Sequence, residues 1–387
     1  MNANPHPCFR PGELWFDDHG VHINAHGGGI AFHEGVYYWI GEHKIESEEG
    51  NRSHIGLHLY SSTDLYHWKD EGIALQVSDD PQSDIVRGCV MERPKLVRNP
   101  RTGKWIIWFH LEKKSQLHHY QSARSGVAIG DKPTGPFVYL ESFRPNPGIW
   151  PMNGPCEPIT DEEYAYQQDV LAHKDPEIDP SLFLRRDFKE GQMARDMTIF
   201  VDDDQKAYHI YSSEENGTLH IAELSDDYLK HSGRYIRILP GRKNEAPAIL
   251  KRQGLYWLFT SGCTGWTPNE ARLAVAPSIW GPWRPLDTPF RGLPGFVATT
   301  FDSQPTCILT VAGNPDAHIY MGDRWRGDNA IDGRYVWLPI NFREGRPEIG
   351  WKDQWDLRVF DAPPHPSPSN KILFDPRDLA EKWRPRH

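Results

Sequence analysis

The sequence predicts an all-β protein with the architecture of a five-bladed β-propeller. Its strand-like segments are short, rich in Tyr, Trp, Ile and Val, and separated by Gly, Pro and Asp, whereas helical periodicity is scarce. One pattern, a turn or Gly followed by an aromatic or β-branched run, recurs at 35–41, 103–110, 204–212, 254–261 and 316–322. Each run is predicted to be the second strand of a repeating sheet. A period of about 50 to 65 residues, with roughly four strands each, is typical of propeller blades, and these repeats fill the chain.

Turn motifs recur beside these runs and support the repeat. Residues 61–68 and 224–229 are predicted to form the turn between the outer strands of a blade. The segments 134–137 (TGPF) and 280–283 (WGPW) are predicted to close a repeat, because Gly supplies an unusual φ and Pro fixes the next one.

The interval between the second and third repeats predicts an insertion. Residues 145–192 are dense in Pro, Asp and Glu and have little strand pattern. We expect either a lid over a pocket or a surface loop with no role in binding. The propeller is predicted to span residues 1–362 as a single domain. Residues 363–387 are expected to form a C-terminal strap, with a helical tendency only over 376–383.

Composition and charge exclude several classes of protein. Lys and Arg number 43 against 53 Asp and Glu, and this net charge of −10 argues against binding to nucleic acid, which needs a basic face. No apolar run approaches the roughly 18 residues of a membrane span, and residues 1–11 lack the apolar core of a signal peptide. We expect a cytoplasmic protein without membrane contact, or a secreted or periplasmic one if a leader has been removed.

The sequence shows no metal or nucleotide motif. The five cysteines are widely spaced, without metal-ligand spacing, and are expected to be mostly reduced thiols. The run 202–204 (DDD) is predicted to be a hairpin turn, because it lacks the spacing of a calcium loop. No Walker loop, dinucleotide fingerprint, GxSxG elbow or HExxH motif is present.

Polar residues precede every repeat. The inner strands of a propeller converge on a central channel, so residues at the start of each blade can point at one small volume. These residues include Asn24, His26, Glu92, Arg93, Arg195, Asp196, Glu245 and Gln304. Hydrolysis of a glycosidic bond needs a carboxylic acid that protonates the leaving oxygen, and a neighbouring carboxylate keeps such an acid protonated by raising its pKa. The carboxylates Glu92, Asp196 and Glu245 therefore predict a glycosidase.

The third and fourth repeats resemble a known family. The segment 195–208 (RDMTIFVDDDQKAY), and 245–248 (EAPA) followed by 254–258 (GLYWL), are similar to glycoside hydrolase family 43, whose members are five-bladed propellers that cleave with inversion of configuration. The resemblance extends over nearly the whole chain apart from the insertion and the tail. It implies that Glu245 is the general acid and that Asp196 tunes its pKa.

The first blade departs from the usual family pattern. The stretch that matches the family's catalytic base, an Asp, reads NAHGGG at 24–29. Together with 92–95 (ERPK), 262–269 (GCTGWTPN) and 303–306 (SQPT), it is similar to the branch that contains exo-β-1,3-galactanases. In that branch the resemblance implies that Gln304 positions the attacking water, by orientation or through a minor tautomer. His26 or Glu92 are alternative bases, and His26 is otherwise a hydroxyl donor or a structural residue of the channel.

Further side chains are expected to contact the sugar. Glu92 and Arg93 suit recognition of hydroxyl orientation, and Arg195 lies beside Asp196. The indoles of Trp266 and Trp325 either stack on a pyranose or pack in the core. Thr264 and Asn269 either bind hydroxyls or form a turn.

These residues and the resemblance together predict an exo-acting glycoside hydrolase. The expected activity is release of terminal galactose from β-1,3-galactan or arabinogalactan-type glycans. No cofactor is expected to be required, and the sequence leaves open whether a cation sits in the channel. The partner would be a galactose- or arabinose-containing oligosaccharide or polysaccharide. An α-L-arabinofuranosidase, a β-galactofuranosidase, a carbohydrate-binding propeller without catalysis and a protein-interaction propeller are the alternatives.

Overall fold

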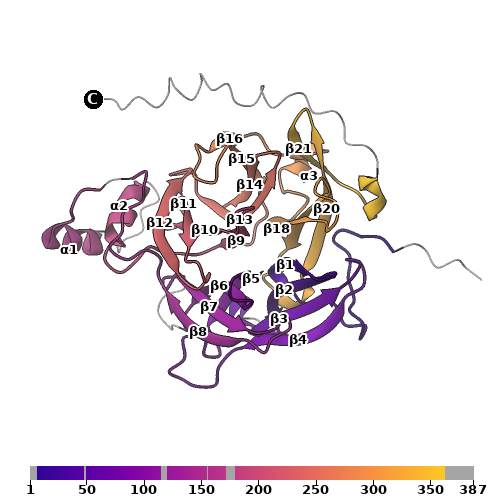
Figure 1. Cartoon of the computed structure of the whole chain (residues 1–387), viewed down its shortest axis with the longest axis horizontal. Helices are drawn as coiled ribbons and strands as arrows, with labels where there is room; N and C mark the ends of the chain where they lie inside the picture. Colours follow the sequence, from indigo (N-terminus) through magenta and orange to yellow (C-terminus); the bar gives the residue numbers. More distant parts are fainter. Residues whose placement is uncertain (1–6, 48, 115–119, 155, 171–178, 362–387) are drawn as a thin grey trace, which may run out of the picture.

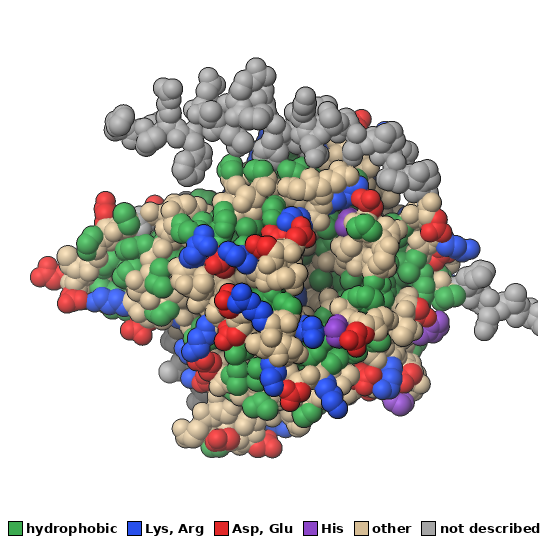
Figure 2. Space-filling model, viewed as in Figure 1, with side chains coloured by type: hydrophobic (Ala, Val, Ile, Leu, Met, Phe, Trp, Pro, Cys, Tyr) green, Lys and Arg blue, Asp and Glu red, His purple; other side chains and the backbone are tan. Residues whose placement is uncertain are grey.

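A computed structural model describes residues 7–47, 49–114, 120–154, 156–170 and 179–361. Its strands form five sheets arranged around a common centre, each made from one continuous stretch of chain (Figure 1). The predicted five-bladed β-propeller is therefore confirmed. Figure 2 shows acidic and basic side chains interspersed over the viewed face rather than gathered into one basic area.

The blades follow one another in chain order, and their strands run from the centre outward. Blade 1 contains β1 (His26–His33), β2 (Val36–Lys44), β3 (His54–Ser62) and β4 (Lys69–Gln76). Blade 2 contains β5 (Val90–Arg98), β6 (Trp105–Glu112), β7 (Arg124–Gly130) and β8 (Val138–Phe143). Blade 3 contains β9 (Met197–Val201), β10 (Ala207–Ser213), β11 (Thr218–Leu224) and β12 (His231–Ile238). Blade 4 contains β13 (Asn244–Arg252), β14 (Leu255–Gly262), β15 (Arg272–Ala276) and β16 (Arg284–Leu286). Blade 5 contains β18 (Gln304–Thr310), β19 (His318–Arg324), β20 (Arg334–Arg343), β21 (Arg346–Gly350) and the short β17 (Phe290–Arg291).

The core lies between the blades. Every residue of β6 is buried, because its side chains alternate between the two neighbouring blades. Ile107 and Phe109 join the apolar cluster shared with blade 1, whereas Ile106 and Trp108 join the cluster shared with blade 3. Comparable clusters fill the other interfaces. The five recurring segments of the sequence correspond to the second strands β2, β6, β10, β14 and β19, as predicted.

Apolar packing joins the last blade to the first. Trp39 of β2 and Trp337 of β20 lie in one cluster with Phe9 and Trp355. The backbone amide of Phe9 donates to the carbonyl of Trp355 at 2.7 Å, and the amide of Trp355 donates back at 3.1 Å. The segment before β1 therefore helps to hold blade 5 against blade 1.

The inner strands begin with a shared irregularity. In β1, β5 and β13 the register shifts by one residue just after His26, Glu92 and Glu245. The next residue in each strand has a left-handed backbone: Gly27 (φ 61°), Arg93 (φ 55°) and Ala246 (φ 52°). Such β-bulges re-aim the side chains beside them. They give the residue just before the bulge, His26, Glu92 or Glu245, an equivalent place in three blades.

The turn assignment needs one correction. Residues 61–68 and 224–229 do lie between the third and fourth strands of their blades, as predicted. The TGPF and WGPW segments were expected to close a repeat, which is wrong, because they connect β7 to β8 and β15 to β16. A Gly-Pro pair suits a reversal between adjacent antiparallel strands, whereas the blade-to-blade connections are the longer loops that lead into the inner strands.

The insertion is helical and lies beside blade 3. It contains α1 (Asp161–Val170) and α2 (Pro180–Arg186), which sit outside the ring near β12 (Figure 1). The Tyr235 hydroxyl of β12 donates to the Ile149 carbonyl at 2.8 Å, and Asn153 bonds to the backbone of Arg237. The lid expectation is wrong for the described part of the insertion, because none of its residues lines the pocket reported below.

The remaining helical elements are short. In the described part of the chain they are α3 (Pro294–Val297) and three 3-10 helices at Gly50–Arg52, Ala330–Asp332 and Leu357–Phe360. Among the described residues, no helix has the length and apolarity needed to cross a membrane. The expected C-terminal strap, residues 363–387, lies outside the described residues.

Candidate active site

The starts of the inner strands surround a single pocket of about 410 Å³. Blades 2 to 5 and the loops around them contribute side chains that the sequence had singled out: Glu92, Arg93, Arg195, Asp196, Glu245, Trp266, Gln304 and Trp325. The predicted convergence of these residues is confirmed, although their individual roles remain predictions. A pocket of this size, with charged groups beside indole rings, is suited to a small polar ligand.

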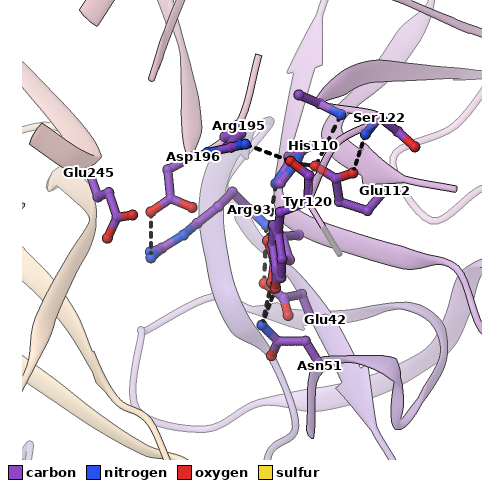
Figure 3. A network of polar contacts seen from close by, with 12 residues as sticks. Glu42, Asn51, Arg93, His110, Glu112, Tyr120, Ser122, Arg195, Asp196 and Glu245 are labelled. Carbon is purple, nitrogen blue, oxygen red and sulfur yellow. Dashed lines mark hydrogen bonds and ion pairs between the residues drawn. The ribbon is translucent and has the colours of Figure 1, made fainter. Parts of the chain in front are cut away.

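Glu245 and Asp196 form a carboxylate pair at the wall of this pocket. The amide of Ala246 donates to Asp196 Oδ2 at 3.0 Å, which ties the two residues together. Figure 3 shows Asp196 between Glu245 and Arg93, and the Arg93 guanidinium lies 3.0 Å from Asp196 Oδ2. Burial and the charge of Asp196 raise the pKa of Glu245 to about 7. Glu245 can therefore hold and release a proton near neutral pH.

Glu92 has the opposite electrostatic environment. Its Oε1 accepts from Asn51 Nδ2 at 2.5 Å and from the Tyr120 hydroxyl at 2.6 Å, and its Oε2 lies 3.0 Å from His110 Nδ1. Burial raises the pKa of Glu92, but the hydrogen bond and charge of His110 outweigh it and bring the pKa to about 2. A carboxylate that holds its charge so strongly is a poor proton acceptor and a good hydroxyl acceptor.

Arg93 fixes the orientation of Gln304. Its guanidinium donates to Gln304 Oε1 at 2.5 Å and to the Pro305 carbonyl at 3.1 Å, and it lies over the Trp325 ring at 5.2 Å. Gln304 Nε2 donates to Ser261 Oγ at 2.9 Å. The amide group is therefore held at both ends, with its oxygen toward the charged side of the pocket.

His26 lies behind the pocket wall. It is 1% exposed and its ring stacks on Trp325 at 5.1 Å between centroids. Burial, together with the positive charge of Lys44, lowers the pKa of His26 to about 3, so the ring is neutral at physiological pH. The structure does not bring His26 to the pocket surface, and its contact there is made through Trp325.

Thr264 and Asn269 are used within their own loop. The Thr264 hydroxyl donates to the Thr267 carbonyl, and Asn269 Nδ2 donates to Thr264 Oγ1 at 2.7 Å and to the Gly262 carbonyl at 3.0 Å. Neither residue lines the main pocket, although Asn269 lines a small cavity of about 30 Å³ that shares Trp266, Gln304 and Trp325 with it. Their contacts support the turn-forming alternative.

Sequence reasoning missed several polar residues of the site. Some lie on second strands directly opposite a predicted residue: His110 opposite Glu92, Ser261 opposite Glu245 and Asp323 opposite Gln304. Cross-strand pairing would have revealed these residues once the blades were aligned. The others carry no periodic signal: Asn51 lies in the 3-10 helix Gly50–Arg52, and Tyr120 and Asn216 lie on turns.

One cluster in the site has a geometry that could hold a cation. Glu92, His110 and Asp196 each offer a ligand atom, all within 4.8 Å of one another. His110 is nevertheless bonded at both ring nitrogens, to Glu92 at 3.0 Å and to Glu112 at 2.9 Å. Burial lowers the pKa of His110, but these carboxylates outweigh it and raise the pKa to about 10. An imidazolium ring fits this place better than a metal ligand does.

Known proteins resemble the chain in both sequence and structure. Residues 168–290 match the profile of glycosyl hydrolases family 43. A solved family 43 β-1,3-galactosidase with galactodeoxynojirimycin is 49% identical, with a TM-score of 0.81 over 90% of this chain and 100% of that chain. An exo-β-1,3-galactanase from Clostridium thermocellum is 32% identical, with a TM-score of 0.71 over 90% of this chain and 66% of that chain. A β-D-galactofuranosidase of Aspergillus niger is 31% identical over 147 residues, which are 37% of this chain, and the chain spans only 41% of that relative's length.

Fold, pocket and similarity together define a glycoside hydrolase. Paired carboxylates in a propeller channel supply the groups that glycosidic hydrolysis needs, and the solved relatives share the fold over most of the chain. The chain belongs to glycoside hydrolase family 43.

Proposed function

We propose that this protein is an inverting, exo-acting β-1,3-galactosidase that releases terminal galactose from β-1,3-galactan or arabinogalactan-type glycans. The observation that carries the proposal is the partly buried carboxyl of Glu245, raised in pKa beside Asp196, within a chain that is 49% identical to a β-1,3-galactosidase over that protein's full length. A solved exo-β-1,3-galactanase from Phanerochaete chrysosporium with β-1,3-galactotriose is also similar, at 28% identity and a TM-score of 0.72 over 92% of this chain and 70% of that chain.

In this proposal Glu245 protonates the glycosidic oxygen while a water molecule attacks the anomeric carbon. Asp196 keeps Glu245 protonated through its negative charge. Gln304 orients the water, because its amide is fixed by Arg93 and Ser261. The bond from the anomeric carbon to the leaving oxygen breaks as the bond to water forms. One proton of the water stays on the new anomeric hydroxyl, and the other is released to bulk water, from which Glu245 is reprotonated for the next cycle.

The other pocket residues would bind the terminal sugar. Glu92 and Arg93 present a charged acceptor and a charged donor to its hydroxyls. Arg195 and the indoles of Trp266 and Trp325 complete the wall, and Trp266 is 47% exposed at the pocket, where a ring can stack on a sugar face. These steps need no cofactor. In this proposal the His110 imidazolium supplies the positive charge at the place where a cation could otherwise bind.

Hydrolysis of a β-D-galactofuranoside is the second candidate. The similarity to the Aspergillus niger β-D-galactofuranosidase favours it, although that match covers 37% of this chain. A furanose and a pyranose place their hydroxyls differently, so the buried Glu92 and Arg93 should discriminate between them.

A substrate panel tests the proposal. Purified protein is incubated with β-1,3-galactobiose, β-1,3-galactan, and the nitrophenyl glycosides of β-D-galactopyranose, β-D-galactofuranose and α-L-arabinofuranose. We expect free galactose from the first two substrates. Release of sugar from the furanosides alone would identify a β-D-galactofuranosidase or an α-L-arabinofuranosidase instead. Binding without turnover of any substrate would identify a carbohydrate-binding propeller.

A further inference from the structure

The turn between β10 and β11 has an unusual backbone for its sequence. Glu214, Glu215 and Asn216 are consecutive non-glycine residues in the left-handed region, with φ of 53°, 54° and 63°. This region is costly for residues with a Cβ, so three in a row persist only where the surroundings hold them. The turn is near the chemistry, because Asn216 Nδ2 donates to Glu245 Oε1 at 2.7 Å.

A buried carboxylate holds the first residue of this turn. Glu214 is fully buried and accepts from Thr218 Oγ1 at 2.7 Å and from Arg237 Nε at 2.6 Å, and His220 Nε2 lies 2.8 Å from it. These partners belong to blade 3 itself. They anchor the base of the turn but do not reach Asn216.

The insertion holds the other side of the turn. Arg186, the last residue of α2, donates to Glu215 Oε1 at 3.1 Å, and Arg195 of the pocket donates to Glu215 Oε2 at 2.7 Å. At the other end of α2, Pro180 packs so closely against Gly217 that a Cβ on that glycine would lie 2.9 Å from Pro180 Cγ. Helix α2 therefore contacts the turn with both its first and its last residue.

Helix α2 is itself firmly placed. Asp179 caps its start by accepting from the amide of Ser181, and Phe183 and Leu184 are buried. Gln192 Nε2 donates to the Leu184 carbonyl at 3.0 Å. A helix fixed at these points can resist movement of the turn that it touches.

We propose that the insertion helix α2, acting through Arg186, is a positioning device that holds the Glu215–Asn216 turn so that Asn216 orients the proton-donating carboxyl of Glu245. This inference rests on the proposed role of Glu245 as the acid. The bond from Asn216 occupies Oε1 and leaves Oε2 to carry the proton. Loss of the bond would free the carboxyl to rotate and would remove a donor that favours its charged form, so the pKa of Glu245 would rise.

The test compares Arg186→Met with Arg185→Met. Arg185 is a matched control, because it lies on the same helix and is similarly buried, but it pairs with Glu163 and lies over Trp150 instead of contacting the turn. The substrates are β-1,3-galactobiose, whose poor leaving group needs protonation, and 2,4-dinitrophenyl β-D-galactoside, whose leaving group does not.

We expect Arg186→Met to lose about tenfold in kcat on galactobiose and to keep its kcat on the dinitrophenyl substrate within about twofold. The alkaline limb of its pH profile should move to higher pH. Arg185→Met should match the wild type on both substrates. An equal loss on both substrates, or no loss on either, would overturn the inference.

Two further variants keep the test decisive. Arg186→Lys retains the positive charge and should recover part of the galactobiose activity. If Arg186→Met does not fold, Arg186→Lys replaces it, and we expect a smaller loss of kcat that is again confined to galactobiose. Absence of that selective loss in Arg186→Lys would then overturn the inference. Glu245→Gln is the reference. If Glu245→Gln loses activity equally on both substrates, the proposed function fails. If Glu245→Gln loses activity mainly on galactobiose but Arg186→Met does not, only the role of α2 is wrong.

Discussion

At the scale of single residues, the site contains two glutamates whose surroundings shift their pKa values in opposite directions. Glu245 lies beside another carboxylate and has a pKa near neutrality, whereas Glu92 lies against His110 and stays charged. Two carboxyl groups with separated pKa values can divide proton donation from hydroxyl binding. The difference comes from their neighbours, because both residues hold the same place at the start of an inner strand.

Glu245→Gln is expected to lower kcat on β-1,3-galactobiose by at least ~10²-fold, because the amide cannot give up a proton to the leaving oxygen. Circular dichroism and thermal unfolding should match the wild type. Glu348→Gln, a change outside the pocket in blade 5, is the control and should be fully active. Near-normal activity of Glu245→Gln would remove this residue from the acid role.

Asp196→Asn is expected to shift the pH dependence. Activity requires protonated Glu245, so the wild-type rate should fall as the pH rises through about 7. Removal of the Asp196 charge leaves burial as the main cause that raises the pKa of Glu245, so this pKa falls and the alkaline limb moves to lower pH. The measurement is kcat/KM against pH. A limb that stays in place or moves upward would contradict the electrostatic role of Asp196.

Gln304→Ala is expected to lose about 10²-fold in kcat, because the attacking water is no longer oriented. Ser261→Ala removes only one of the two bonds that hold the Gln304 side chain and should lose less. The comparison is made by steady-state kinetics on β-1,3-galactobiose. Retained activity in Gln304→Ala would show that Gln304 does not position the attacking water.

At the scale of elements, the bulges that open the inner strands place the site residues. The bulge of β1 brings backbone atoms into close contact. A Cβ on Gly28 would lie 1.9 Å from the Ile40 carbonyl oxygen of the neighbouring strand. Local backbone packing at the axis therefore determines where the first residue of the strand points.

Gly28→Ala tests this dependence on backbone packing. The added methyl must displace the backbone of β2, which we expect to destabilise the fold by about 1–3 kcal/mol and to lower activity together with Tm. Gly350→Ala, at a strand glycine with open space around it, should change stability by less than about 0.5 kcal/mol. Denaturant unfolding measures both variants. An unchanged midpoint for Gly28→Ala would show that this contact is not constraining.

The elements differ in how far the sequence could predict them. The second strands were predictable because burial on both faces imposes a run of aromatic and β-branched residues, as in β6. The placement of the Gly-Pro turns was not, because a Gly-Pro pair specifies a reversal without saying which two strands it joins. The insertion was recognisable as an interruption, but its packing against blade 3 depends on contacts such as Arg186 with Glu215, which are distant in sequence.

At the scale of the whole molecule, the ring brings residues 92, 196, 245 and 304 into one pocket. The repeat pattern made their convergence predictable, because equivalent positions in blades must meet at the axis. The position of His26 behind Trp325 was not predictable, because it follows from the stacking of two blades against each other. The polar partners on loops, such as Tyr120 and Asn216, were likewise hidden until the fold placed them.

The most direct test of the account is proton NMR of β-1,3-galactan during the first minutes of hydrolysis. If Glu245 donates the proton while water is held by Gln304 on the opposite face, galactose must be the only early product, and it must appear as the α-anomer before it equilibrates. Initial release of β-galactose would show retention and contradict this arrangement, and release of longer fragments would contradict exo action.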